Sequence, residues 1–76
     1  MDRRLRVKVA DCSADRLCRI ASQAGFSVVE GKKHCKIVTL GGQFVTTVPR
    51  HPRLKRETVR GVIKALNAFG TQIEIL

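Results

Sequence analysis

The 76-residue chain carries 15 Lys and Arg against 6 Asp and Glu, a formal net charge of +9 at pH 7, and 43% of its residues are hydrophobic. This length supports a single domain, expected over residues 1–76, and the hydrophobic fraction excludes a disordered basic tail. The positive charge predicts a polyanionic partner, nucleic acid first. No apolar run approaches the ~18 residues of a membrane helix, so we expect a cytoplasmic protein without a membrane partner.

The cysteines and histidines do not predict a metal site. Cys12, Cys18 and Cys35 are odd in number and lack the spacing of a disulfide framework, and neither they nor the two histidines form a pair with metal-ligand spacing. The carboxylates are scattered, and no phosphate-binding glycine motif is present. We therefore expect no metal and no cofactor, and we expect Cys18 and Cys35 to be small core residues.

The first elements are a strand and a helix. Apolar and basic residues alternate over 5–9, which predicts a short strand. A helix is predicted over 14–24, because apolar residues recur there at helical spacing. Ser13 is its expected N-cap, and Gly25 supplies a left-handed stop.

Three β-type runs follow, at residues 26–30, 34–40 and 43–48. Gly41 and Gly42 separate the last two runs. They predict a two-residue hairpin loop, because glycine takes positive φ without steric cost.

The predicted loop sets the pairing of the second and third runs. It pairs Val38 with Val45 and Lys36 with Thr47, and cross-strand partners share one face of a sheet. The face expected to pack on helices carries Cys35, Ile37, Thr39, Phe44, Thr46 and Val48, whereas His34, Lys36, Val38, Val45 and Thr47 are expected to face outward.

The chain ends in a second helix and a tail. Apolar residues at helical spacing begin at Val59, with Thr58 as the expected N-cap and Gly70 as the stop. Residues 72–76 alternate again and predict a last strand beside the first. The whole order describes an α+β domain with both helices over one face of a sheet.

Basic residues concentrate in the second half of the chain, which predicts a surface that contacts RNA phosphates. The only aromatic residues, Phe26, Phe44 and Phe69, fall at expected core positions, so no base-stacking surface is predicted. Recognition through shape, phosphates and 2′-hydroxyls is favoured. The predicted RNA-binding residues are Lys32, Lys33, Arg50, Arg53, Lys55, Arg56, Arg60 and Lys64.

His34 is the candidate catalytic residue. A neutral imidazole can take the proton from a 2′-hydroxyl, so that this oxygen attacks the adjacent phosphorus. Lys36, two residues further on the same face, is positioned to stabilise the charge that develops on the phosphorane. His51 is a weaker candidate for the general acid. The competing interpretation for each is a solvated or phosphate-binding surface residue.

Three segments together resemble a known family, the HicA-type mRNA interferase toxins, which have a double-stranded-RNA-binding-domain-like fold. Residues 25–34, with the letters GFSVVEGKKH, resemble the family's strand and glycine-led catalytic-histidine segment. Residues 44–52 (FVTTVPRHP) and 58–66 (TVRGVIKAL) resemble its third strand and second helix. The similarity covers about residues 13–70. Lys32 and Lys33 are a departure, because the family commonly has a serine after this glycine.

The resemblance implies a core order α-β-β-β-α and a toxin of a type II toxin-antitoxin system. It implies an endoribonuclease that cleaves mRNA without a metal, with His34 as its catalytic histidine, and that is inhibited by a HicB-type antitoxin. We expect this antitoxin to cover His34 and an outward patch of Val38 and Val45. The alternative is a non-catalytic module that binds double-stranded RNA or DNA through the same basic face, and a third interpretation is a module for an acidic protein partner.

Overall fold

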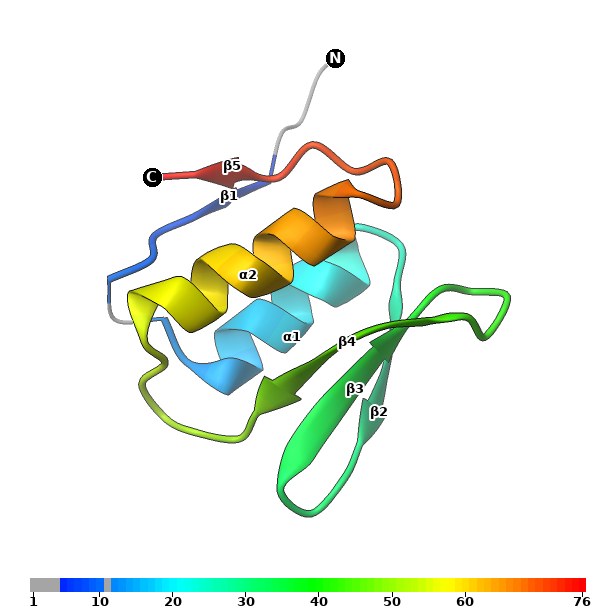
Figure 1. The fold of residues 1–76 in the computed structure, drawn as a ribbon, viewed down its shortest axis with the longest axis horizontal. Helices are drawn as coiled ribbons and strands as arrows, with labels where there is room; N and C mark the ends of the chain where they lie inside the picture. Colours follow the sequence, from blue (N-terminus) through cyan, green and yellow to red (C-terminus); the bar gives the residue numbers. More distant parts are fainter. Residues whose placement is uncertain (1–4, 11) are drawn as a thin grey trace.

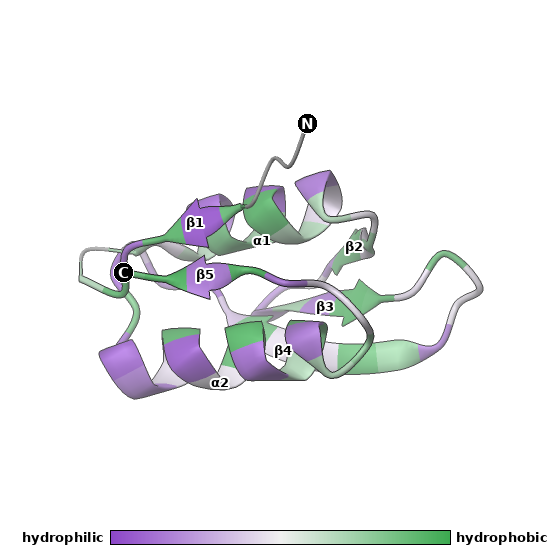
Figure 2. Ribbon diagram, turned by 90° about the horizontal axis from the view of Figure 1, so that it is seen from above, coloured by the Kyte–Doolittle hydropathy of each residue, from purple (hydrophilic) through white to green (hydrophobic). Residues whose placement is uncertain are grey.

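A computed structural model describes residues 5–10 and 12–76 of the chain, which form an α+β architecture. Two helices lie between a two-stranded pair, β1–β5, and a three-stranded antiparallel sheet in the order β2-β3-β4 (Figures 1 and 2). The elements are β1 (Arg6–Val7), α1 (Ala14–Gln23), β2 (Ser27–Glu30), β3 (His34–Val38), β4 (Phe44–Pro49), α2 (Arg56–Asn67) and β5 (Glu74–Ile75).

Helix α1 forms as its sequence predicts. The Ser13 side chain accepts a hydrogen bond from the Arg16 backbone N–H at 3.1 Å, which satisfies one of the free donors of the first turn. Gly25 ends the helical path with φ of +99°. Leu17 is fully buried and Ile20 is 6% exposed, so the apolar face of this helix packs into the core.

Helix α2 begins earlier than the sequence indicated. The expected N-cap, Thr58, is wrong, because the N-cap is Lys55, whose carbonyl accepts from the Val59 N–H at 3.1 Å. No side chain caps this end. Gly70, with φ of +103°, follows the last turn as predicted.

The β3–β4 hairpin has a three-residue loop, so the predicted two-residue loop at Gly41 and Gly42 is wrong. Thr39 N–H donates to the Gln43 carbonyl at 2.8 Å, and Gly42 N–H donates to the Thr39 carbonyl at 2.9 Å. Gly42 has φ of +91°, which only glycine adopts without strain. This combination is the usual three-residue hairpin connection, and it moves Gln43 opposite Thr39.

The longer loop changes the pairing near the hairpin end. Lys36 pairs with Thr47 as predicted, but Val38 pairs with Phe44 instead of Val45, because β4 carries one extra residue. This bulge turns the side chains beyond it to the opposite face. Phe44 is therefore 54% exposed and not in the core, whereas Val45 packs partly against the core.

Away from the bulge, the faces are as predicted. Cys35, Ile37 and Val48 are buried beneath the helices, and His34 and Lys36 are exposed. Phe26 is buried as well, but Phe69 is 42% exposed and meets the Phe26 ring edge-on, with 6.4 Å between ring centroids. The expectation that all three phenylalanines belong to the core is thus wrong for Phe44. Phe69 contacts a core ring but is itself partly exposed.

The predicted pairing of the first and last strands is confirmed, in a parallel arrangement. Arg6 lies opposite Glu74 and Val7 opposite Ile75, and the Arg6 Nε and Glu74 Oε2 atoms are 3.0 Å apart. The return from α2 to β5 depends on one amide side chain. Asn67 Oδ1 accepts from the Ile73 backbone N–H at 2.9 Å, and Asn67 Nδ2 donates to the Ile73 carbonyl at 3.1 Å. This side chain therefore directs the tail across the helices.

Candidate nucleic-acid interface and catalytic histidine

The turn between β2 and β3 holds His34 at the start of β3. The Gly31 N–H donates to the His34 carbonyl at 3.0 Å, which leaves Lys32 and Lys33 as the two loop residues. Glu30 and Cys35 form the next pair in the ladder. Two cations, Lys32 and Lys33, therefore directly precede the histidine in the chain.

Arg50 ties this turn to the segment that follows β4. Its Nη1 donates to the Gly31 carbonyl at 2.7 Å, and its backbone N–H donates to the Lys33 carbonyl at 3.1 Å. Arg50 thus holds the turn from both its side chain and its main chain. One of its guanidinium donors is used inside the protein, although the residue was predicted as an RNA contact.

His34 and Lys36 lie on the face of the sheet that the helices do not cover. Both side chains are exposed, and alternation along β3 places them on the same side as Val38. Their Cα atoms are separated by two residues of strand, which is about 7 Å. The predicted pairing of a histidine and a cation on one surface is therefore present in the geometry.

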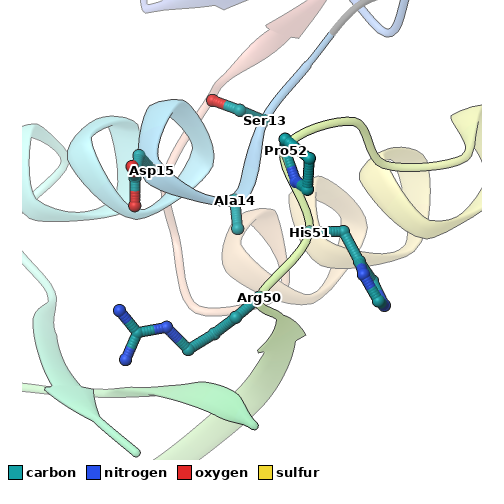
Figure 3. A pocket seen from close by; sticks show the side chains of 6 residues that line it. All are labelled: Ser13, Ala14, Asp15, Arg50, His51 and Pro52. Carbon is teal, nitrogen blue, oxygen red and sulfur yellow. The ribbon is translucent and has the colours of Figure 1, made fainter. Parts of the chain in front are cut away.

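The second histidine lies at the same end of the sheet. Pro49 is the ladder partner of His34, and the His51 N–H donates to the Pro49 carbonyl at 2.9 Å. The backbone carbonyl of His51 also accepts a hydrogen bond from the Ala14 N–H at 3.0 Å, which fixes the segment against the start of α1. Figure 3 shows the pocket at this junction, in which the Arg50 side chain extends toward the sheet and the His51 ring points in a different direction.

The other predicted RNA-binding residues do not all share the face of His34. Lys32 and Lys33 are exposed in its turn, and Arg53 and Lys55 are exposed in the segment before α2. Helix α2 packs against the opposite face of the sheet, chiefly over β4. Its exposed residues Arg56, Arg60 and Lys64 follow one another at the helical spacing of four, so they form a separate basic row.

Of the two cysteines expected in the core, Cys35 is buried and Cys18 is half-buried. Burial raises the pKa of the Cys18 thiol to about 12, and its hydrogen bond with Cys35 and the nearby carboxylates of Asp15 and Glu30 act in the same direction. This thiol is therefore protonated at neutral pH and a poor nucleophile. Within residues 5–10 and 12–76, no three His, Cys, Asp or Glu side chains come together to hold a metal ion.

Sequence reasoning missed two parts of the site. The hydrogen bond from Arg50 to Gly31 joins residues 19 positions apart, and no local pattern indicates it. The second is apolar: Val29 is 52% exposed and Phe44 54% exposed, and both lie on the same sheet face as His34. The predicted outward patch of Val38 and Val45 is wrong for Val45. The bulge in β4 causes this error, because it reverses the faces to which the side chains beyond it point.

Comparison with known proteins adds no relative: no family model, no curated protein and no solved structure matches this chain. In the part of the chain that the structure describes, neither helix is long and apolar enough to cross a membrane.

Replacing Gly31 by alanine tests how closely the turn is packed around His34. A Cβ on Gly31 would lie 2.7 Å from the His34 carbonyl oxygen, so the backbone of the turn must shift. We expect the Gly31→Ala variant to lose about 1–3 kcal/mol of unfolding free energy, as overpacked sites do, measured by urea denaturation.

The matched control is Gly61→Ala, at an exposed position within α2 where a Cβ meets no atom within 4 Å. This variant should gain about 0.5–1 kcal/mol, because alanine is the better helix former. Equal stability of Gly31→Ala and the parent chain would contradict the close approach at the turn.

Proposed function

We propose that this protein is a metal-independent endoribonuclease of the HicA toxin type, which cleaves mRNA with His34 as the general base. The observation that carries the proposal is the exposed position of His34 at the first residue of β3, with Lys32, Lys33 and Lys36 next to it. An exposed histidine among cations suits a polyanionic substrate, because the cations attract phosphates to the base.

The chemistry follows from these residue types. The His34 imidazole takes the proton of a 2′-hydroxyl, and the oxygen attacks the adjacent phosphorus. The bond from phosphorus to the 5′-oxygen of the next nucleotide breaks, and this oxygen takes up a proton from water, which leaves a 2′,3′-cyclic phosphate and a 5′-hydroxyl end. Lys36 supports the charge on the phosphorane oxygens. In this scheme Lys32, Lys33 and Arg50 hold the flanking phosphates, and Arg53, Lys55, Arg56, Arg60 and Lys64 extend the contact.

A double-stranded-RNA-binding-domain-like fold is part of the same proposal. Its support is the order α1-β2-β3-β4-α2, with an antiparallel sheet that carries both helices on one face. The second candidate function, a non-catalytic module for double-stranded RNA or DNA, is favoured by the basic row of Arg56, Arg60 and Lys64, which suits duplex phosphates. Only the first function requires RNA cleavage, and that cleavage depends on His34.

The test is cleavage of a long single-stranded RNA in the presence of EDTA by the parent chain and by the His34→Ala variant. We expect cleavage by the parent chain only, with a loss of at least about 100-fold in the variant, since general-base catalysis contributes about 10²–10⁴-fold. RNA affinity should change little, because in this proposal the lysines and arginines, and not the His34 ring, make the contacts with the phosphates.

Lys36→Ala is the companion variant, and it should lower the cleavage rate while the basic row on α2 still binds RNA. Equal cleavage by the parent chain and by the His34→Ala variant would contradict the assignment of His34 as the catalytic base. RNA binding without cleavage by the parent chain would favour a non-catalytic nucleic-acid-binding module.

We further propose that a HicB-type antitoxin covers the uncovered sheet face. Support comes from the exposed Val29 and Phe44 side chains beside His34 and Lys36, because an apolar area rimmed by cations suits a protein with acidic residues around an apolar centre. Such a partner would exclude RNA from His34.

The prediction for the complex is that carbethoxylation of His34 by diethyl pyrocarbonate falls at least about tenfold when the antitoxin is bound, as mass spectrometry of peptides can measure. His51, an exposed histidine whose ring points in a different direction from the Arg50 side chain (Figure 3), is the internal reference. An unchanged rate at His34 would contradict occlusion of the site.

A further inference from the structure

Phe44 lies on the uncovered face of the sheet and not in the core. Its ladder partner is Val38, which shares a face with Lys36 and His34 by the alternation of β3. The ring is 54% exposed. Burial in the core therefore does not explain why an aromatic side chain occupies this position.

The surroundings of the ring favour a charged ligand with an apolar face. Val29 pairs with Lys36 across β2 and β3, and Val29 is 52% exposed, so apolar and cationic side chains are neighbours on this surface. The turn at the far end of β3 adds Lys32 and Lys33. Because the chain has a net charge of +9, a second copy of it would be repelled. A polyanion with flat apolar rings is complementary both to the positive charge and to the exposed apolar side chains of this surface.

Single-stranded RNA has this combination of properties. Its unpaired bases can be splayed out and stacked on aromatic side chains, and its phosphates pair with lysines. We propose that the uncovered sheet face is a binding surface for single-stranded RNA, on which one base stacks against the Phe44 ring while Lys36 holds the backbone. A duplex cannot use this site, because its bases already stack on one another.

The site complements the proposed cleavage and rests on the proposed function in taking RNA as the ligand. His34 and Val38 are separated by four residues of β3, about 14 Å between Cα atoms. The stacked base therefore belongs to a nucleotide near the scissile one and not to the scissile nucleotide itself. Phe44 would then influence which sequences are cleaved.

The sequence permits a direct optical test, because the chain contains neither tryptophan nor tyrosine. The Phe44→Trp substitution, made in the inactive His34→Ala background, places a single indole on the sheet face. The probe is an unstructured single-stranded RNA of about 12 nucleotides, within the usual range of site sizes. The same strand annealed to its complement is the duplex control, and Phe69→Trp, on the helix side of the fold, is the position control.

We expect the single strand to quench indole emission at position 44 by at least half, with little change from the duplex or in the Phe69→Trp control. Phe44→Leu, which keeps an apolar side chain without a π-face, should weaken single-strand binding about 5- to 150-fold, as loss of one stacked base does. Fluorescence anisotropy of labelled RNA measures this affinity. Circular dichroism checks that each variant folds.

Two results would overturn the proposal. One is RNA binding by anisotropy with unchanged emission at position 44 and equal affinity of Phe44→Leu, which would leave the apolar face to a protein partner. The other is equal quenching by the duplex. The outcome is separate from the proposed catalysis, because quenching without cleavage by the parent chain supports the single-strand site and refutes the nuclease. Cleavage without quenching supports the nuclease and refutes the single-strand site.

Discussion

Burial of Cys35 and Ile37 beneath the two helices is the constraint on which the surface of this protein depends. Successive side chains of a strand point to opposite faces, so two buried positions fix the direction of their neighbours. Burying Ile37 contributes about 1.5–3 kcal/mol, and a register slip of one residue would expose it. The same packing therefore holds the core together and keeps His34 and Lys36 in solvent.

This constraint also explains which parts of the molecule could be predicted. The two amphipathic helices, the β2–β3–β4 order and the outward direction of His34 follow from local periodicity, which survives in the structure wherever the pattern is regular. The start of α2 was misplaced because Lys55 lacks a capping side chain, so Thr58 gave the more visible signal. The β1–β5 pairing was predicted from alternation at both ends of the chain, and the structure adds its parallel direction.

The errors concentrate where non-local geometry overrides the local pattern. Two adjacent glycines favour a two-residue loop, but Gly42 alone takes positive φ and the loop includes Leu40. The resulting shift and the extra residue in β4 turn Phe44 outward. The bond from Arg50 to Gly31 could not be predicted either, because it depends on where the chain runs after Pro49.

Positive charge is divided between two surfaces with different neighbours. On the sheet face, Lys36 lies among exposed apolar side chains and beside the candidate base, whereas the row on α2 is a helix surface on the other side of the sheet. In the proposed function, phosphates of one long RNA contact both surfaces, and a partner that covers only the sheet face blocks cleavage without neutralising the α2 row. The proposed function therefore assigns RNA binding and RNA cleavage to different surfaces.

The central claim is that the 2′-hydroxyl of the substrate is the nucleophile that the protein activates. The most direct measurement uses an RNA with one 2′-deoxynucleotide at a mapped cleavage position, incubated with the parent chain in EDTA. The account predicts that cleavage is lost at this position and continues at unmodified positions of the same strand. Cleavage at the deoxynucleotide would contradict it, because that position has no 2′-oxygen to attack.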